Sequence, residues 1–371
     1  MNQGTTHRFF TENLLAWFAQ NHRPLPWKGE RDPYKIWLSE IILQQTRVEQ
    51  GLPYFQKFVA QYPTVRDLAD APEDEVMKTW QGLGYYSRAR NLHATAKFVA
   101  HELGGRFPDT FEALLQLKGV GDYTAAAIAS FAFGLPHAVL DGNVYRVLAR
   151  FFGIETPTNL PAAKKEFARL ANQVLDPTRP ADFNQAIMDF GATHCTPQQP
   201  KCLACPMRPQ CAAHLYNKVS ELPVRGRRLE KKERFFLFAV FRVGADTFVR
   251  KRSERDIWQD LYEFPLAELT ALPTERTEIV DIISNNFLDG EANGFEVLQV
   301  SKPYKQVLTH QTVMAIFCEI VLKDNDLGSK NLESLSRKYI RTNRIQLKKM
   351  YAVPRIIDSY LRDEVLLLSL F

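Results

Sequence analysis

The chain has 371 residues, more than one hydrophobic core usually organises, and a formal net charge of +5 that suits nucleic acid without requiring it. Its 45% hydrophobic and 24% charged residues are typical of a globular protein and exclude a disordered chain. No apolar run approaches the roughly 18 residues of a membrane span, and the first residues lack the order of a secretory signal. We therefore expect two domains, no membrane association, and a cytoplasmic protein whose thiols stay reduced.

Residues 1–217 are predicted to be almost entirely helical. Apolar residues recur there at spacings of three and four positions, and Pro and Gly mark the breaks. Asp32 and Pro33 predict the start of one helix, because Asp caps helices and Pro fits their first turn. Residues 111–117 predict a short amphipathic helix and residues 123–133 a longer one.

The character of the sequence changes near residue 218. Residues 218–234, KVSELPVRGRRLEKKER, are polar and dense in charge, which predicts an exposed linker, although such a basic run could also follow a phosphate backbone. Strands dominate residues 235–371: a hairpin is predicted from residues 234–243 and 247–252, and a further strand from 313–321. With a helix expected at 275–287, this second domain is predicted to be α+β.

Four of the five cysteines, Cys195, Cys202, Cys205 and Cys211, form the pattern C-x6-C-x2-C-x5-C. Four thiolates can hold either a zinc ion or an iron–sulfur cluster, and the spacing alone only slightly favours the cluster. Several prolines between the cysteines predict a wrapped loop, not a helix. The fifth, Cys318, lies in an apolar strand pattern and is expected to be buried.

Residues 117–125, LKGVGDYTA, lie between the two predicted helices at 111–117 and 123–133. Gly119 and Gly121 permit a sharp turn, and the helix that follows would present free N–H groups to a phosphate. The Gly-x-Gly pattern alone is weak evidence for a DNA-binding hairpin, because any tight helix–helix turn could use it. The whole string is typical of a helix–hairpin–helix that binds DNA without reading its sequence.

Two carboxylates are candidates for catalysis. Glu40 shares a largely apolar helix face with Ile36 and Trp37, so burial would raise its pKa and suit a general acid. The alternative is a Glu that reaches solvent at the edge of this face. Asp141 precedes a predicted helix and is expected to be its N-cap, where a carboxylate stays ionised and could stabilise positive charge on a sugar. The pair fits glycoside chemistry, which uses one protonated and one ionised carboxyl group.

These motifs together resemble one family. The strings WLSEIILQQT, GLGYYSRARNL, LKGVGDYTAAAI and VLDGNVYRV, with the cysteine loop, resemble the endonuclease III (helix–hairpin–helix) superfamily of DNA glycosylases, and within it the adenine DNA glycosylases of the MutY type. The resemblance covers nearly the whole chain. It implies an all-α glycosylase domain over residues 1–217 that includes a [4Fe-4S] loop at 195–211, and an active site in a cleft. It also implies that adenine opposite 8-oxoguanine or guanine is flipped out of double-stranded DNA and removed in base-excision repair.

The resemblance assigns roles to individual residues. Glu40 protonates adenine and later helps to activate water, Asp141 stabilises the oxocarbenium-like sugar, Tyr123 assists and Asn143 orients Asp141. The residues expected to contact DNA or adenine are Trp27, Lys28, Gln45, Thr46, Tyr85, Gly119, Val120, Gly121 and Gln185. Gln45 and Tyr85 match residues that wedge into the base stack beside 8-oxoguanine. The cluster is expected to shape a DNA-facing loop that includes Lys201 and Arg208.

The residue at position 123 predicts whether the glycosylase is monofunctional or bifunctional. Bifunctional relatives carry a lysine at the position of Tyr123, whose amine forms a Schiff base and cleaves the strand. Lys118 lies on the other side of the turn and is not expected to replace it. We therefore predict a monofunctional enzyme that acts as a monomer in a bacterial cytoplasm, on the nucleoid.

The second domain, residues 235–371, resembles Nudix-like (MutT-like) domains through its segment IWQDLYEFP. The paired glutamates that would hold Mg²⁺ are missing from the sequence after it, so recognition and not hydrolysis is expected. In the family a Phe-Ser-His loop reads 8-oxoguanine. Here the matching residues are Leu308, Thr309 and His310, and the leucine puts the aromatic stacking contact in doubt.

Two alternative functions remain at this point. One is a bifunctional or thymine-directed glycosylase of the same superfamily, which Tyr123 and the second domain disfavour. The other is a non-catalytic, zinc-containing DNA-binding protein, which the pairing of Glu40 with Asp141 disfavours.

Overall fold

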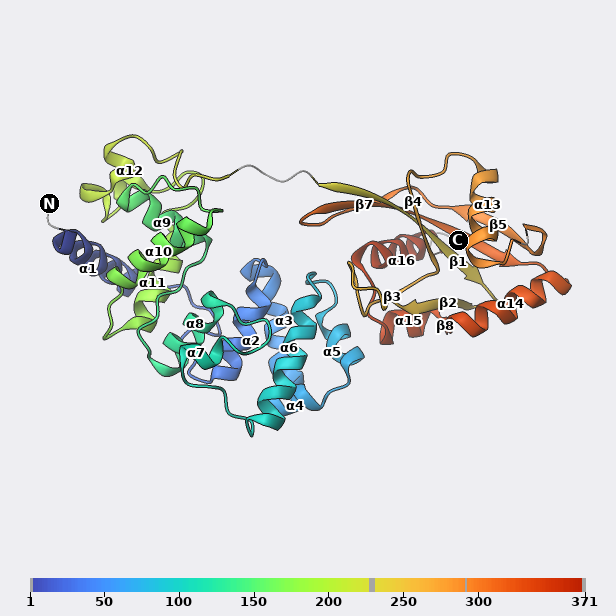
Figure 1. The fold of residues 1–371 in the computed structure, drawn as a ribbon, viewed down its shortest axis with the longest axis horizontal. Helices are drawn as coiled ribbons and strands as arrows, with labels where there is room; N and C mark the ends of the chain where they lie inside the picture. The colour runs from blue at the N-terminus through green and yellow to red at the C-terminus, as the bar shows by residue number, and fades with distance from the viewer. Residues whose placement is uncertain (1–2, 227–230, 291, 369–371) are drawn as a thin grey trace. The chain divides into compact units, whose positions relative to one another are not determined.

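The structure, a computed structural model, describes residues 3–226, 231–290 and 292–368 (Figure 1). The chain forms two compact units: residues 1–70 with 91–228, and residues 71–90 with 229–371. Residues 227–230 of the predicted linker lie outside the described residues. Within the described stretches, no helix has both the length and the apolar character needed to cross a membrane.

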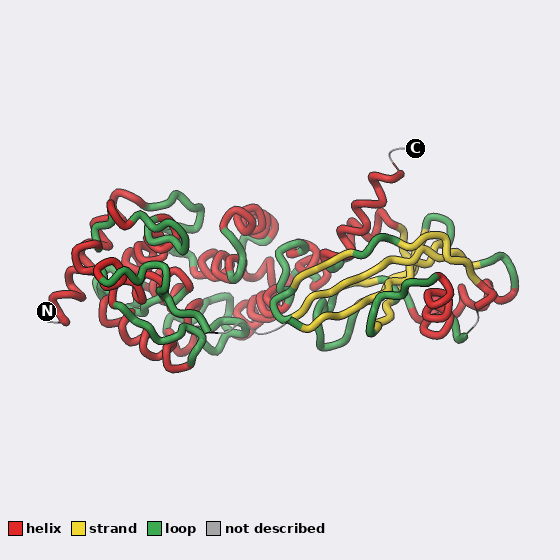
Figure 2. Tube along the Cα trace, turned by 90° about the horizontal axis from the view of Figure 1, so that it is seen from above, coloured by secondary structure: helices red, strands yellow, loops and turns green. Residues whose placement is uncertain are grey.

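The first unit is helical, as predicted, and residues 3–226 contain no strand (Figure 2). Its α-helices are α1 (Gln3–Asn21), α2 (Pro33–Leu43), α3 (Val48–Gln61), α4 (Val65–Asp70), α7 (Phe111–Leu114), α8 (Asp122–Phe133), α9 (Gly142–Phe152), α10 (Pro161–Val174), α11 (Pro180–Thr193) and α12 (Ala212–Leu215). Shorter helical turns are η1 (Phe98–Glu102), η2 (Cys202–Ala204) and η3 (Arg208–Gln210). The predicted helix at 111–117 is therefore shorter than expected.

Local sequence signals account for the starts of the two helices that matter most for the site. The side chain of Asp32 accepts a hydrogen bond from the backbone N–H of Tyr34, and Pro33 occupies the first position of α2. Asp141 caps α9 in the same way, because its side chain accepts from the N–H of Val144 at 2.7 Å. Both caps were predicted. Helices α1, α8, α9, α10 and α11 then share one apolar core, in which Phe10, Phe167 and Phe183 are buried.

The second unit contains the strands, and one short segment, residues 71–90, completes it. Helix α5 (Glu73–Trp80) and the start of α6 (Ser87–Lys97) belong to it by their contacts. The strands are β1 (Lys232–Arg242), β2 (Asp246–Lys251), β3 (Tyr262–Glu263), β4 (Leu266–Leu269), β5 (Phe295–Val300), β6 (Tyr304–Val307), β7 (Gln311–Leu322) and β8 (Ile340–Asn343). The remaining helices are α13 (Arg276–Phe287), η4 (Ala292–Gly294), α14 (Asp326–Lys338), α15 (Arg344–Met350) and α16 (Arg355–Leu368).

These strands form two sheets. One has the order β4-β1-β7-β5, with β6 also paired to β7, and the other has the order β3-β2-β8. Strand β1 is parallel to β7 along its whole length, from Lys232 opposite Gln311 to Arg242 opposite Val321. The predicted hairpin of residues 234–243 with 247–252 is wrong: a single bridge joins Val243 to Asp246, and the two strands then enter different sheets. The strand at 313–321 and the helix at 275–287 were predicted.

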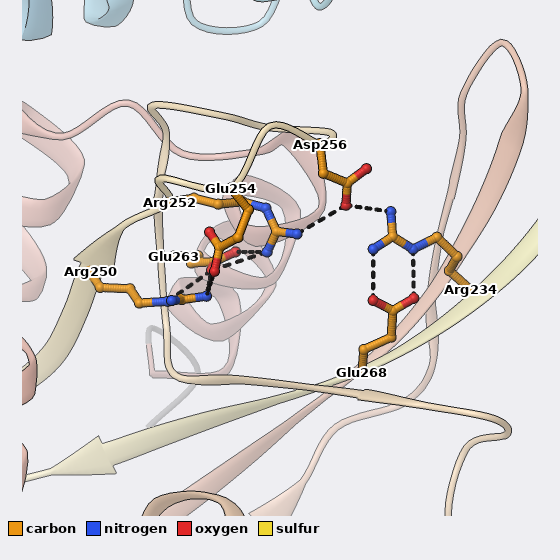
Figure 3. A network of polar contacts seen from close by, with 7 residues as sticks. All are labelled: Arg234, Arg250, Arg252, Glu254, Asp256, Glu263 and Glu268. Carbon is orange, nitrogen blue, oxygen red and sulfur yellow. Dashed lines mark hydrogen bonds and ion pairs between the residues drawn. The ribbon is translucent and has the colours of Figure 1, made fainter.

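A network of alternating positive and negative side chains connects β1, β4 and the loop between β2 and β3 (Figure 3). Arg234 on β1 forms a bidentate pair with Glu268 on β4 and donates to Asp256, each contact at 2.7 Å. Asp256 also accepts from Arg252, which in turn pairs with the buried Glu263. Because each buried charge has an opposite partner, the network fixes the loop between β2 and β3 relative to β1.

Candidate active site

A cleft of about 1470 Å³ opens in the helical unit. The ends of α2, α8 and α9 and one face of α11 line it. It brings together ten of the residues predicted for catalysis or binding: Trp27, Lys28, Glu40, Gln45, Thr46, Gly121, Tyr123, Asp141, Asn143 and Gln185. These positions lie up to 158 residues apart in sequence (Trp27 to Gln185), so tertiary structure alone assembles them.

Glu40 lies in the last turns of α2 and is 8% exposed. Burial raises the pKa of Glu40 to about 7, and the nearby negative charge of Asp141 adds to this effect, while a hydrogen bond from Tyr123 opposes it. A carboxyl group with this pKa holds a proton in about half of the molecules at neutral pH. The expected solvent-reaching alternative for Glu40 therefore does not apply, and its side chain can act as an acid.

Asp141 lines the cleft at the N-terminus of α9. Burial raises its pKa, but N–H groups of Val144 and Asn143 and the positive charge of Arg146 act in the opposite direction. The Asn143 amide donates to Asp141 Oδ2 at 2.8 Å, and Asn143 Oδ1 accepts from Arg146 at 2.7 Å. These donors are directed at the ionised form of the carboxylate and fix its orientation.

Tyr123 occupies the first turn of α8 and interacts with both carboxylates. Its hydroxyl donates a hydrogen bond to Glu40 and also lies 3.4 Å from the sulfur of Met188. The hydroxyl has a single proton, and a carboxylate is a much stronger acceptor than a thioether, so the contact with Glu40 dominates when Glu40 is ionised. Burial and the two nearby carboxylates raise the pKa of Tyr123, so it remains a donor.

Three polar side chains that line the cleft share one partner, Asp189 of α11, which is fully buried. Its carboxylate pairs with Arg23 at 2.9 Å and with Lys28, and it also accepts from Gln185 at 3.4 Å. Burial lowers the pKa of Lys28, although the contact with Asp189 counteracts this. Asp189 therefore orients three polar side chains that line the cleft.

The predicted hairpin is a tight turn that precedes α8. Val120 N–H donates to the carbonyl of Leu117 at 3.0 Å, and Val120 itself is buried. Gly119 has φ +80°, and a Cβ there would lie 2.8 Å from Cβ of Asn91, so only glycine fits without strain. Gly121 is the N-cap of α8 and supplies no capping side chain, which leaves first-turn N–H groups available to an external acceptor such as a phosphate. Of these three residues only Gly121 lines the cleft.

Tyr85, Thr309 and His310 belong to the second unit. The Tyr85 hydroxyl lies 2.8 Å from Thr309 Oγ1, so two residues predicted to contact the opposite base are in direct contact. Leu308, Thr309 and His310 form the turn between β6 and β7, closed by the bond from Leu308 N–H to Gln311 O. The carbonyls of Leu308 and His310 accept from Lys231 Nζ and from Lys232 N–H, which fixes the turn to the start of β1.

The four clustered cysteines lie on one loop after α11, in short 3₁₀ turns and extended segments. Burial raises the pKa of Cys202, Cys205 and Cys211, and negative charge on Cys195 adds to this effect in all three. Arg150 of α9 donates to Cys195 Sγ at 3.5 Å and to Thr196 O at 2.7 Å. Cys318 is buried in β7, as predicted.

Comparison with known proteins assigns this chain to a family. Residues 38–174 match the HhH-GPD superfamily of base excision DNA repair proteins. The adenine DNA glycosylase of Buchnera aphidicola subsp. Acyrthosiphon pisum is 34% identical over 261 residues, which cover 70% of this chain and 75% of that protein. The chain belongs to the adenine DNA glycosylase family. The adenine DNA glycosylase of Rattus norvegicus is 47% identical over 214 residues, which cover 55% of this chain but only 42% of that longer protein.

Solved structures agree with this assignment for the helical part of the glycosylase. A thermostable thymine-DNA glycosylase superposes with a TM-score of 0.55 at 33% identity and covers 58% of this chain and 100% of its own. An endonuclease III bound non-covalently to DNA has a TM-score of 0.51 at 22% identity, over 58% of this chain and 99% of its own, and so shares the fold. The protein is thus a DNA glycosylase with the helix–hairpin–helix architecture.

Two residues that sequence reasoning missed, Asp189 and Arg146, contact side chains of the candidate site. Asp189 lies four positions after Gln185 on α11, and its isolation in an apolar stretch was the available signal. Arg146 lies three positions after Asn143 on α9, and donates to Asn143, to Gly191 O and to Cys195 O. Arg146 therefore connects the side chain that orients Asp141 with the beginning of the cysteine loop.

Proposed function

We propose that this enzyme is a monofunctional adenine DNA glycosylase that acts, as a monomer, on adenine mispaired with 8-oxoguanine or guanine in double-stranded DNA. The observation that carries the proposal is the meeting of Glu40, Tyr123 and Asp141 in one cleft. These groups supply an acid, a hydrogen-bond donor and a carboxylate held by N–H donors, which N-glycosidic bond hydrolysis requires. The names of the relatives support adenine as the base removed.

The proposed reaction begins when a flipped adenine enters the cleft. Protonated Glu40 donates to N7 of adenine, so that the base leaves as a neutral group while positive charge develops on the deoxyribose. Asp141, held by Asn143 and the N–H of Val144, stabilises that charge. Glu40, now ionised and still bonded to Tyr123, then accepts a proton from the water that attacks the sugar. Trp27, Lys28 and Gln185 would contact the adenine.

The enzyme is proposed not to cleave the DNA strand, because residue 123 is a tyrosine. A bifunctional enzyme of this superfamily would use a lysine there to form a Schiff base, and tyrosine has no amine to do so. The product is therefore an intact strand with an abasic site.

The second unit is proposed to read the base opposite adenine. Tyr85 would wedge into the base stack, and the exposed turn with Thr309 and His310 would contact 8-oxoguanine. We further propose that residues 235–371 form a Nudix-like domain used for recognition. Leu308 replaces the family's aromatic residue, so the contact at that position is apolar packing without ring stacking.

The cysteine loop is proposed to hold a [4Fe-4S] cluster through Cys195, Cys202, Cys205 and Cys211. Backbone N–H groups of Met207, Ala213 and His214 donate to the sulfurs of Cys205 and Cys211, and such donors favour thiolate ligands. Among the described residues, no three His, Cys, Asp or Glu side chains form a group that could hold a metal ion. The proposal of a cluster therefore rests on the cysteine pattern and on these N–H donors. When bound, the cluster supplies structural cross-linking of this loop.

A duplex assay tests the proposal. The protein is incubated with duplexes that contain A opposite 8-oxoguanine, A opposite G, T opposite G, or A opposite T, and half of each sample is then treated with alkali. We expect breaks only after alkali and only in the adenine strand, and we expect them to form faster when the adenine is opposite 8-oxoguanine. Breaks without alkali would identify a bifunctional enzyme, and breaks at T opposite G would identify a thymine-directed one. Binding without any break would identify a non-catalytic protein.

The metal content tests the cluster. We expect the purified protein to be brown, to absorb visible light and to contain no zinc.

A further inference from the structure

The segment of residues 71–90 carries Tyr85 and, by its contacts, groups with the strand-containing unit. Its first anchor is Asp74 in the first turn of α5. Asp74 accepts from Lys251 Nζ at 2.8 Å and from the Tyr262 hydroxyl at 2.9 Å. Lys251 on β2 and Tyr262 on β3 are paired across the sheet, so one carboxylate binds two neighbouring strands.

A second anchor lies at the other end of the segment. Arg90 donates to the carbonyl of Gln259 at 2.7 Å, and its Nε lies 3.4 Å from Asp260 Oδ2. The turn that Arg90 holds has Trp258 at φ +62° and Asp260 at φ +63°, a conformation that side chains with a Cβ rarely adopt and that surrounding contacts must maintain. Asp260 N–H also donates to the carbonyl of Arg252, whose side chain belongs to the charge network of Figure 3.

Between the anchors, the loop with Tyr85 is fixed from inside the segment. The carbonyl of Gly84 accepts from Trp80 Nε1 at 3.0 Å and from Arg88 at 3.3 Å. The Arg88 guanidinium also lies over the rings of Trp80 and Tyr85, at 5.1 and 5.4 Å from their centroids. Tyr85 itself has φ +48°, so its backbone position depends on these contacts. The segment is therefore held to the strand-containing unit by the ion pairs of Asp74 and Arg90 at its ends, with further hydrogen bonds from Lys78 to Tyr351 O and from Val353 N–H to Gln81 between them. Together these contacts set the position of the Tyr85 ring relative to Thr309.

We propose that Asp74 and Arg90 are positioning residues that determine specificity for the base opposite adenine, because they hold Tyr85 in register with the 308–310 turn. This inference rests on the proposed function. 8-Oxoguanine differs from guanine only at N7 and C8, so the discrimination depends on a few well-placed contacts. Loss of an anchor would let Tyr85 shift relative to Thr309 while the catalytic cleft in the other unit keeps its own residues.

The test measures single-turnover release of adenine from duplexes with A opposite 8-oxoguanine and A opposite G. In Asp74→Ala and Arg90→Ala we expect the ratio of the two rates to fall about fivefold or more, with the rate opposite G within about twofold of wild type. Glu73→Ala is the matched control, because it removes the same charge one residue earlier and lies 3.9 Å from Lys251 without a hydrogen bond to it. Its ratio should stay within about twofold of wild type.

Two further variants separate positioning from loss of folding. Lys251→Ala should reproduce the effect of Asp74→Ala, and combining them should add little, because both remove the same bridge. Tyr262→Phe, which removes only the hydroxyl, should give a smaller loss in the ratio. An unchanged ratio in Asp74→Ala and Arg90→Ala, or a parallel fall of both rates, would overturn the inference. A wild-type protein that releases no adenine, or shows no preference, would instead overturn the proposed function on which it rests.

Discussion

Burial determines the proton occupancy of Glu40 near neutral pH. Its pKa of about 7 arises mainly from desolvation, with a contribution from the charge of Asp141. As the proposed general acid, Glu40 is active only while it carries its proton, so the reactive fraction of the enzyme should be full below this pKa and decrease above it. The same shift also changes the stability of the folded protein.

The rate of adenine release should therefore fall at high pH. Under single-turnover conditions we expect the rate to decrease above about pH 7 and to approach a tenfold loss per unit by about pH 9. Duplex binding, measured in parallel by fluorescence anisotropy, should change little over this range. A chemical rate that stays constant to pH 9 would exclude Glu40 as the acid whose proton is transferred.

Replacing Glu40 by Gln should abolish release and stabilise the fold at high pH. The unfolded pKa is 4.5 and the folded pKa about 7, so between these values the folded protein binds more protons and its free energy of unfolding falls as pH rises. The full shift corresponds to about 3 kcal/mol. Denaturant unfolding at about pH 8 should show Glu40→Gln more stable than wild type by up to this amount, with the difference absent near pH 4. Equal stability at both pH values would mean that Glu40 is not desolvated.

At the scale of elements, the hairpin before α8 depends on one backbone conformation. Gly119→Ala combines a strained φ of +80° with a contact of 2.8 Å to Asn91 Cβ. Gly134→Ala, at the C-terminal end of the same helix, has φ +68° but nothing within 4 Å of its Cβ, and so isolates the cost of the strain. We expect about 1 kcal/mol of destabilisation for Gly134→Ala and about 2–3 kcal/mol for Gly119→Ala, with weaker duplex binding only for the latter. Chemical denaturation of both variants measures this, and equal losses would contradict the contact.

The elements that sequence reasoning predicted are those specified by local chemistry. Asp32 with Pro33, and Asp141, define helix starts through contacts within three residues, so no distant partner is needed. The prediction that β1 and β2 form a hairpin was wrong because the hydrophobic pattern of a strand does not identify the strand with which it pairs. β1 instead gains a longer parallel pairing with β7, which begins at Lys232 opposite Gln311.

The same distinction holds for the site. Glu40 and Asp141 could be found because their own neighbours in sequence indicate burial and capping. The roles of Asp189 and Arg146 could not be found, because each also has a distant partner: Asp189 contacts Arg23 across 166 residues, and Arg146 contacts Cys195 across 49. The isolation of Asp189 in an apolar stretch signals burial but does not identify these partners. The resemblance to a family supplies the proposed catalytic residues but not the residues that support them.

At the scale of the whole molecule, the chain passes between its two units more than once. It leaves the helical unit after residue 70, contributes residues 71–90 to the strand-containing unit, returns, and leaves again at residue 228. The strand-containing unit has its own core, formed by residues such as Phe241, Phe248 and Ile316. Helix α5 therefore depends on residues more than 170 positions later in sequence, as the bond from Lys251 to Asp74 shows.

This dependence can be measured by hydrogen exchange. In a chain that ends at residue 226, α5 loses the partners of Asp74 and also Tyr351 O, which accepts from Lys78 at 2.8 Å. We expect amides of α5 to exchange about tenfold or more faster than in the full chain, while amides of α8, whose core lies in the helical unit, keep their protection. Full-length Asp74→Ala should show a smaller change in the same helix, which separates loss of this anchor from other effects of truncation. If α5 in the truncated chain were protected as in the full chain, contacts with the remaining helices would suffice to hold it, and the strand-containing unit would not control the position of Tyr85.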